Sequence, residues 1–441
     1  MRIQLNKLNW ALICEGILTL VVLRSAYESA LFFFWEGRLP PPYFFDTNDT
    51  FMDWFNVAYW AHNPGAYDTF LTVYPPLSYV FLKLTTVASC YKFDGRFARE
   101  CDWAFPWVLA GFYLLNVYLV WRCYRKKDKS TALMRTATMS LGLPMLFSVE
   151  RGQLLIPCFT AFVLAHGNIL RSARWKWVWA AVTINFKPYL VLTAIPNFLR
   201  RRWSALEGYA VATVAVYLLT WGLFGSGSVD EIWENTVHFG EMNTGLQFYV
   251  AYYQTTYNGI LMALDSVYPF THFMGSTPVE LMANGFPILM IGGALAVGLC
   301  ILLSMWRPYA IPVSRLTALS VAAVITNSLV GGYTQILLFF LVLLEPWRGP
   351  ARITALIAVY LLSISWDVYL VNVVHGVELS YLSNRLVGWD IGVSLGEMVR
   401  PGLILLIEYA LVIQSLIDVW NARKPSAPPA LAMPTLAPQP A

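Results

Sequence analysis

The chain has 441 residues, of which 57% are hydrophobic and only 13% are charged, with a formal net charge of +4 at pH 7. Soluble domains carry about 25% charged residues, and a soluble chain this apolar would expose large adhesive patches. The composition excludes a soluble protein and indicates an integral membrane protein. It also excludes nucleic acid as a partner, because the basic residues form no stripe long enough to follow a phosphate backbone.

Apolar segments follow one another along almost the whole chain, the first of them interrupted by Arg24 and Glu28. A helix needs about 20 apolar residues to cross a bilayer, so they predict roughly ten to twelve transmembrane helices over residues 1–423. The expected fold class is an all-α polytopic membrane protein whose outer-face loops carry short juxtamembrane helices. The segments are 9–34, 74–90, 103–121, 133–149, 154–170, 177–199, 205–224, 287–306, 316–330, 336–344, 353–371 and 403–420.

Clusters of basic residues separate several of these segments. By the positive-inside rule they mark cytoplasmic loops, so both termini lie in the cytoplasm and the loops 35–73, 225–284 and 372–398 face outward from the cell (inner) membrane. The tail at 424–441 is rich in Pro and Ala and is expected to be disordered. The clusters are Arg122 to Lys129, Arg171 to Lys176, Arg200 to Arg202, Arg348 with Arg352, and Arg423 with Lys424.

Two segments do not fit simple crossings. A full crossing by 74–90 would place the first basic cluster outside, so this segment is either short and re-entrant or an exception to the charge rule. The segment 177–199 has basic residues at both ends and is too short to cross twice. Because Lys187-Pro188 lies at its centre, we expect a broken re-entrant hairpin with Lys187 near the tip.

Lysine at membrane depth is costly and marks a candidate functional site, although an ion pair that only orients helices is the alternative. The cysteines indicate no metal site. Cys90 and Cys101 bracket a short polar loop and can form a disulfide if that loop faces an oxidising compartment.

The first outer loop contains three carboxylates, Asp46, Asp49 and Asp53, in FFDTNDTFMDWFNVAYW. One reading is a solvated loop with turns and a helix cap. The other is that a carboxylate at the outer face accepts the proton of an acceptor hydroxyl. Asp53 is the best placed, because the amphipathic stretch 54–62 that follows could lie on the membrane and fix it. Asp46 and Asp49 could help to hold a divalent metal, which we do not favour.

A second polar group, Glu150-Arg151-Gly152-Gln153, lies between two apolar segments on the expected outer side. Arg151 could pair with Glu150 or reach the interface. Together with Lys187 it could instead bind an anionic lipid phosphate and stabilise the charge that develops as the phosphate leaves. The second outer loop adds QFYVAYYQTTYNGIL, in which aromatic and amide side chains suit sugar recognition or an interfacial aromatic belt.

The order of these motifs resembles glycosyltransferase family 87, a polyprenol-phosphate-sugar mannosyltransferase-like group of the GT-C superfamily. The resemblance is carried by MDWFNVAYWAHNPGAYDTFLTVYPP, VERGQLL and INFKPYLVL, and covers roughly the first half of the chain. It implies a GT-C-like helical bundle and an inverting transfer of a mannose-like hexose. The donor would be a polyprenyl-phosphate sugar rather than a nucleotide sugar, and the acceptor a lipid or glycan at the outer face.

The resemblance, together with the polar residues described above, suggests roles for individual residues. Asp53 would be the catalytic base, with Asp49 as the other candidate. Substrate-binding residues would be Tyr74, Arg151, Gln153, Lys187 and Asn258. The chain departs from the family late in its sequence, where NSLVGGYTQIL replaces a Ser-Pro…His segment and offers Tyr333 as a substitute.

A transporter or flippase of lipid-linked saccharides is the alternative from another class. It would explain the apolar segments and Lys187 equally well. It would favour two related halves, and the sequence contains no evident internal repeat.

Overall fold

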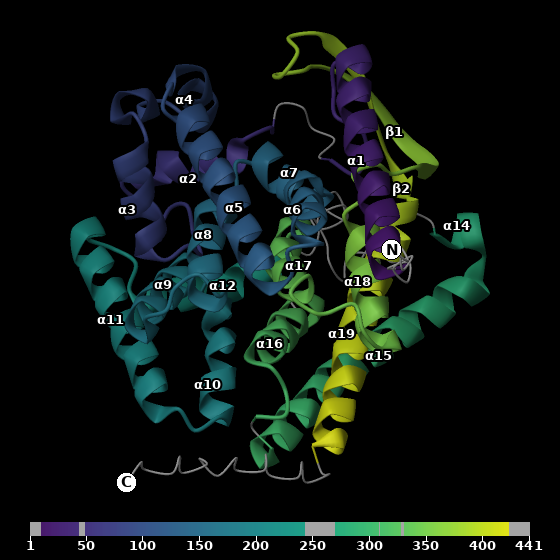
Figure 1. The fold of residues 1–441 in the computed structure, drawn as a ribbon. Helices are drawn as coiled ribbons and strands as arrows, with labels where there is room; N and C mark the ends of the chain where they lie inside the picture. The colour runs from purple at the N-terminus through teal and green to yellow at the C-terminus, as the bar shows by residue number, and fades with distance from the viewer. Residues whose placement is uncertain (1–9, 44–48, 243–269, 308, 328–329, 423–441) are drawn as a thin grey trace, which may run out of the picture.

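The computed structural model describes residues 10–43, 49–242, 270–307, 309–327 and 330–422. It is a bundle of helices with one two-stranded sheet at its edge (Figure 1). The predicted tail at 424–441 lies outside the described residues. The helices of the first half are α1 (Trp10–Glu36), α2 (Met52–His62), α3 (Pro76–Thr85), η1 (Ala88–Tyr91), α4 (Gly95–Cys101), α5 (Phe105–Lys127), α6 (Ala132–Leu141), α7 (Leu143–Glu150), α8 (Leu155–His166), α9 (Ala173–Phe186), η2 (Pro188–Ala194), α10 (Ile195–Leu199) and α11 (Trp203–Phe224).

The second half contains the remaining helices and the sheet. The helices are α12 (Val229–Met242), α14 (Phe270–Met274), α15 (Ser276–Trp306), α16 (Val313–Asn327), η5 (Gly332–Thr334), α17 (Gln335–Val342), α18 (Pro350–Leu362) and α19 (Leu395–Asn421), and the strands are β1 (Tyr369–Leu379) and β2 (Leu386–Ser394).

The polytopic helical class is confirmed, but with fewer complete crossings than predicted. Within the described residues, five helical stretches are long and apolar enough to span a membrane, or six if α4 and α5 form one bent span. Five further apolar helical stretches have only 10–17 residues. At 1.5 Å per residue such helices are shorter than the roughly 30 Å hydrocarbon core. Several segments predicted as full spans are therefore half-length helices packed inside the bundle.

The segment 177–199 is broken at Lys187-Pro188, as predicted. Helix α9 ends at Phe186, Lys187 is extended with φ −140° and ψ 97°, and the chain returns through η2 and α10. Pro188 lacks a backbone N–H and opposes continuation of the helix. Helices α16 and α17, which also contact each other, form a second pair of short helices around η5. Both pairs bring irregular backbone into the middle of the bundle.

The segment 74–90 contains the ten-residue helix α3, too short to cross a membrane, and the start of η1. Helices α2, α3 and α4 gather at one end of the bundle, beside the first turns of α5 (Figure 1). A disulfide joins Cys90 to Cys101 in this layer, the pairing that the sequence left open. Helix α2 does not use its apolar face on a membrane surface, because Trp54 and Phe55 are buried and the Phe55 ring packs on Phe105 at 4.7 Å.

The predicted outer loop at 372–398 is instead mostly a β-hairpin, which is the exception to an all-α fold. Strands β1 and β2 pair antiparallel, with Leu379 opposite Leu386. The hairpin is fixed to the end of α1, because Ser383 Oγ donates to the Gly37 carbonyl at 2.6 Å and Arg385 Nη2 donates to the Trp35 carbonyl at 2.9 Å. The run of Val and Tyr residues in β1 favours a strand.

A buried ionic network joins helices where α16 begins and α19 ends. Arg315 donates to both oxygens of Glu345, at 2.8 and 2.6 Å, and also pairs with Asp418. Arg352 contacts the same two carboxylates, at 3.2 Å and 3.0 Å. A second pair, Arg135 with Glu15, joins α6 to α1. These contacts hold helices that are distant in sequence at one end of the bundle.

Candidate active site

The structure brings together three of the predicted site residues in one hydrogen-bonded group. Arg151 Nη2 donates to Asp53 Oδ1 at 2.8 Å, and Arg151 Nε donates to Asp53 Oδ2 at 3.1 Å. Gln153 Nε2 also donates to Asp53 Oδ2. The guanidinium and the amide are buried, while the Asp53 side chain is 27% exposed. Asp53 is therefore held in one orientation with part of its carboxylate open.

Arg151 also binds the second candidate carboxylate. Its Nη2 lies 2.6 Å from Asp49 Oδ2, and its Nη1 donates to the Asp49 carbonyl at 3.1 Å. The Asp49 side chain is 30% exposed. The sequence suggested Glu150 as the partner of Arg151, but the bidentate partner is Asp53. Since one buried cation serves two carboxylates, Arg151 acts first as the residue that positions them.

Two tight backbone turns hold this group in place. Phe51 has the left-handed φ of 65°, and its N–H donates to the Glu150 carbonyl at 2.9 Å. Gly152 also has a positive φ, 62°. A left-handed backbone is unfavourable for a residue such as Phe and persists only where neighbouring contacts enforce it. The start of α2 is thereby joined to the end of α7, which fixes Asp53 beside Arg151.

Gly152→Ala is expected to destabilise the protein by about 1–2 kcal/mol and to lower activity, because an L-residue is strained in the left-handed region. A Cβ at this position would also lie 3.0 Å from Trp54 Cβ and 3.1 Å from the Phe51 carbonyl oxygen. The free energy of unfolding in lipid nanodiscs measures the effect. Gly111→Ala is the control, since Gly111 lies within α5 with nothing within 4 Å of its added Cβ. Equal effects of the two substitutions would contradict this account of the turn.

Three further predicted residues, Tyr74, Lys187 and Tyr333, make aromatic and cation–ring contacts. Lys187 Nζ lies over the Tyr74 ring, 4.5 Å from its centroid. The Tyr333 ring packs on Phe147, 6.0 Å between centroids, one turn before Arg151 in the chain. Tyr74 precedes α3, Lys187 follows α9, and Tyr333 lies in η5. Asp53 lies in α2, and Arg151 follows α7. The break after α9 thus brings Lys187 beside Tyr74, and η5 brings Tyr333 beside α7.

Sequence analysis did not single out Tyr189 of η2. Its hydroxyl is buried without a hydrogen-bond partner among the described residues, and its ring packs against the same hydrophobic core as Tyr333. Gln153 Oε1 is likewise buried and without such a partner. Unsatisfied buried polar atoms are costly, so both atoms are candidates to bind a substrate hydroxyl. The sequence does point to Tyr189 in one way, because it lies two residues after Lys187, where the helix is expected to break.

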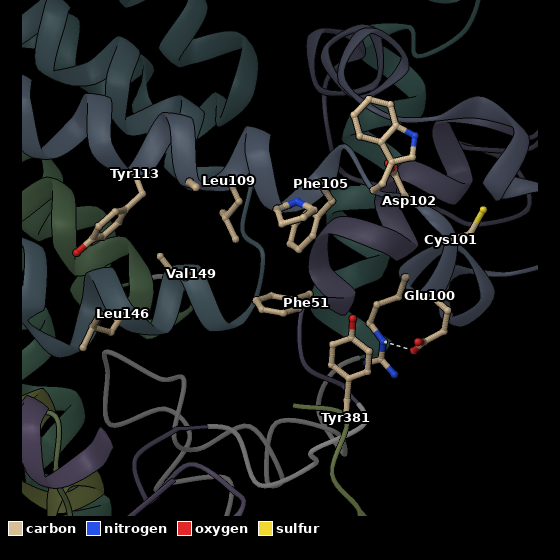
Figure 2. Close-up of a pocket in the computed structure, with 14 residues that line it drawn as sticks. Phe51, Glu100, Cys101, Asp102, Phe105, Leu109, Tyr113, Leu146, Val149 and Tyr381 are labelled. Atoms are coloured by element: carbon tan, nitrogen blue, oxygen red, sulfur yellow. Dashed lines mark ion pairs between the residues drawn. The ribbon is translucent and has the colours of Figure 1, made fainter. Parts of the chain in front are cut away.

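Two cavities flank the site. One, of about 410 Å³, lies between α2 and α4 and is lined by Asp49, Asn56, Asp94 and Arg96, among others. The other, of about 520 Å³, has an apolar part formed by residues of α5 and α7 and a polar end near the Arg99–Glu100 ion pair (Figure 2). Phe51 lines this second cavity (Figure 2), and Asp49 lines the first. The turn that carries the carboxylates therefore separates a polar cavity from a largely apolar one.

Two predicted residues cannot be placed, because Asn258 and Asp46 lie outside the described residues. Within the described ranges, no group of three or more His, Cys, Asp or Glu side chains is arranged to hold a metal ion. Comparison of the chain with models of known protein families, with curated proteins and with solved structures finds no match.

Proposed function

We propose that this protein is a GT-C-type membrane glycosyltransferase. It moves a mannose-like hexose from a polyprenyl-phosphate sugar to a lipid or glycan acceptor at the outer face of the membrane, with inversion. The observation that carries the proposal is the hydrogen-bonded group in which buried Arg151 and Gln153 bind the partly exposed Asp53, 98 and 100 positions away in the chain. A charged group of this kind at the end of an apolar bundle is expensive and marks a functional site.

Asp53 is assigned the role of general base. A carboxylate has about four lone-pair sites, and the three donors from Arg151 and Gln153 leave room for an acceptor hydroxyl. The acceptor oxygen attacks the anomeric carbon as Asp53 takes its proton. The bond from that carbon to the phosphate oxygen breaks, and the polyprenyl phosphate leaves with the electron pair. Attack opposite the leaving group inverts the anomeric centre.

Lys187 is assigned to the leaving phosphate. Its contact with the Tyr74 ring fixes the ammonium while leaving N–H donors for phosphate oxygens. Arg151, which already binds Asp49 and Asp53, completes the positive side of the site. The largely apolar cavity against α5 and α7, which Phe51 also lines, suits the hydrocarbon part of a lipid substrate. The Cys90–Cys101 disulfide supports an outward position for this end of the bundle, since disulfides persist in oxidising compartments.

The decisive experiment uses the full chain, purified and reconstituted in nanodiscs, with a synthetic polyprenyl-phosphate mannose and extracted membrane lipids. We expect a new glycolipid and an equal amount of released polyprenyl phosphate. In parallel, proteoliposomes carry a fluorescent lipid-linked sugar on one leaflet. If the intact lipid moves between leaflets and no combination of donor and acceptor gives sugar transfer, the protein is a flippase and not a glycosyltransferase.

Lys187→Met is expected to raise the KM for the donor by about tenfold or more, because a charge-assisted bond to phosphate contributes roughly 1.5–3 kcal/mol. Lys83→Met is a matched control: Lys83 Nζ also lies over an aromatic ring, that of Phe224, at 4.6 Å, but on the exposed side of α3. Steady-state transfer rates over a range of donor concentrations give KM for each variant. Equal KM values for the two variants would show that Lys187 does not bind the donor phosphate.

A further inference from the structure

Helix α19 carries a glutamate in the middle of its membrane-spanning part. The apolar stretch that can cross the membrane runs over Val399–Asn421. At 1.5 Å per residue, Glu408 lies about 14 Å from the first end of this stretch and about 20 Å from the second. Its side chain is fully buried in the bundle, so it reaches neither membrane surface. Ionisable residues at this depth are rare and are candidate functional sites.

The carboxyl of Glu408 is closely packed, yet both of its oxygens are buried without a hydrogen-bond partner among the described residues. Helix α15 lies directly against it, because a Cβ added to Gly293 would be 3.1 Å from Oε1 and 3.4 Å from Oε2. A buried carboxylate needs hydrogen-bond donors to replace its hydration. The described part of the chain supplies none at this position.

The cations on the surrounding helices are paired with other carboxylates. Helix α19 packs against α15, α16 and α18. The cationic residues on these four helices pair as follows: Arg315 and Arg352 with Glu345 and Asp418, and Arg400 with Asp367. Asp418 lies about 15 Å from Glu408 along α19, at 1.5 Å per residue. The internal segments outside the described ranges contain no Lys, Arg or His. A negative charge on Glu408 would therefore lack a compensating cation from these helices.

The hydroxyl groups beside Glu408 donate elsewhere. Thr326 of α16 is a polar neighbour of the carboxyl, but its hydroxyl donates to the Ala322 carbonyl at 3.0 Å. The hydroxyl of Tyr409, the next residue in the chain, donates to the Leu289 carbonyl at 2.8 Å. A hydroxyl has one proton to donate and two lone pairs, so the Thr326 oxygen can still accept. These surroundings suit a protonated carboxyl, which carries an O–H donor, better than a carboxylate, which can only accept.

We propose that Glu408 is a proton-binding site inside the membrane. Its carboxyl holds a proton at neutral pH, and the O–H is donated to the Thr326 oxygen, which links α19 to α16. A buried carboxyl without a cation or donors becomes neutral, because burying its charge would cost far more than keeping the proton. Glu15 and Glu345 are buried too, but each accepts hydrogen bonds from an arginine. The inference does not depend on the proposed sugar transfer.

Infrared spectroscopy tests the proton directly, because a protonated carboxyl and a carboxylate absorb at different stretching frequencies. The full chain is purified in a detergent without ester groups, and the spectrum of Glu408→Gln is subtracted from that of the wild type at neutral pH. We expect a carboxylic acid band that shifts to lower frequency in heavy water. Glu345→Gln is the matched control. Glu345 is a buried carboxylate that accepts from Arg315 at 2.8 and 2.6 Å, so its difference spectrum should contain carboxylate bands instead.

Thermal unfolding provides a second readout. Glu408→Gln replaces a neutral O–H donor with a neutral N–H donor of similar size, so the melting temperature should stay close to that of the wild type. Glu345→Gln removes a charge that Arg315 and Arg352 share, and should lower the melting temperature by several degrees. Glu408→Met, which removes the carboxyl outright, must lose the same acid band and serves if Glu408→Gln does not fold. Carboxylate bands in the difference spectrum of either Glu408 variant would overturn the inference. An equal loss of stability in Glu408→Gln and Glu345→Gln would overturn it as well, since Glu408 would then be an ion-pair partner.

Discussion

Asp53→Asn is expected to lower the rate of sugar transfer by about two to four orders of magnitude, the usual effect of losing a general base. The substitution keeps the size of the side chain and one oxygen that can accept from Arg151, but it removes the negative charge that accepts the proton. Donor binding should change little, because the phosphate is assigned to Lys187. Transfer from a synthetic polyprenyl-phosphate sugar and the dissociation constant of that donor are both measured on purified protein.

The same substitution also weakens a buried ion pair, so stability must be measured beside activity. Asp49→Asn is the matched variant, because Asp49 also pairs with Arg151 but is not the assigned base. Asp68→Asn, on an exposed loop, controls for a simple change of surface charge. If Asp49→Asn loses as much activity as Asp53→Asn, the role of general base is assigned to Asp49 instead. Full activity in both site variants would remove the catalytic role of this loop.

Arg315→Met is expected to lower the free energy of unfolding by about 3–5 kcal/mol, because removing one partner leaves a buried charge without compensation. Glu345 and Asp418 would then share only Arg352, so two carboxylates would face one cation. Unfolding measured in nanodiscs, for example by steric trapping, reports the change.

Two comparisons isolate the cause of that loss. Arg348→Met removes an exposed arginine from the loop before α18 and should change stability by less than about 0.5 kcal/mol. The double variant Arg315→Met/Glu345→Met leaves one anion and one cation, and should recover most of the stability. A double variant that is no more stable than Arg315→Met would show that packing of the Arg315 side chain, rather than charge balance, is responsible.

The candidate site could be predicted in part because charged residues are conspicuous in an apolar chain. Lys187 stands out by its cost at membrane depth, and Pro188 predicts the helix break that the structure contains. Asp53 was chosen by its position at the start of an amphipathic stretch, which does form α2. Each of these predictions uses residues that are neighbours in the sequence.

The partner of Arg151 could not be predicted in the same way. The sequence offered Glu150, its immediate neighbour, whereas the structure pairs it with Asp53, 98 positions away. That choice depends on the left-handed turns at Phe51 and Gly152, which bring α2 against the end of α7. The sequence likewise does not predict that Arg315 pairs with Asp418, 103 positions away.

The sequence by itself determined that the chain is a helical membrane protein, because hydropathy depends on the local cost of moving each segment out of water. Only the tertiary structure decided which apolar segments are full crossings and which, such as α8 and α18, are half-length helices within the bundle. It also decided that 369–394 forms a β-hairpin. The physical reason is that lipid and protein interior are almost equally apolar. Hydrophobic periodicity therefore does not tell which face of a membrane helix is buried, and packing between distant segments settles it.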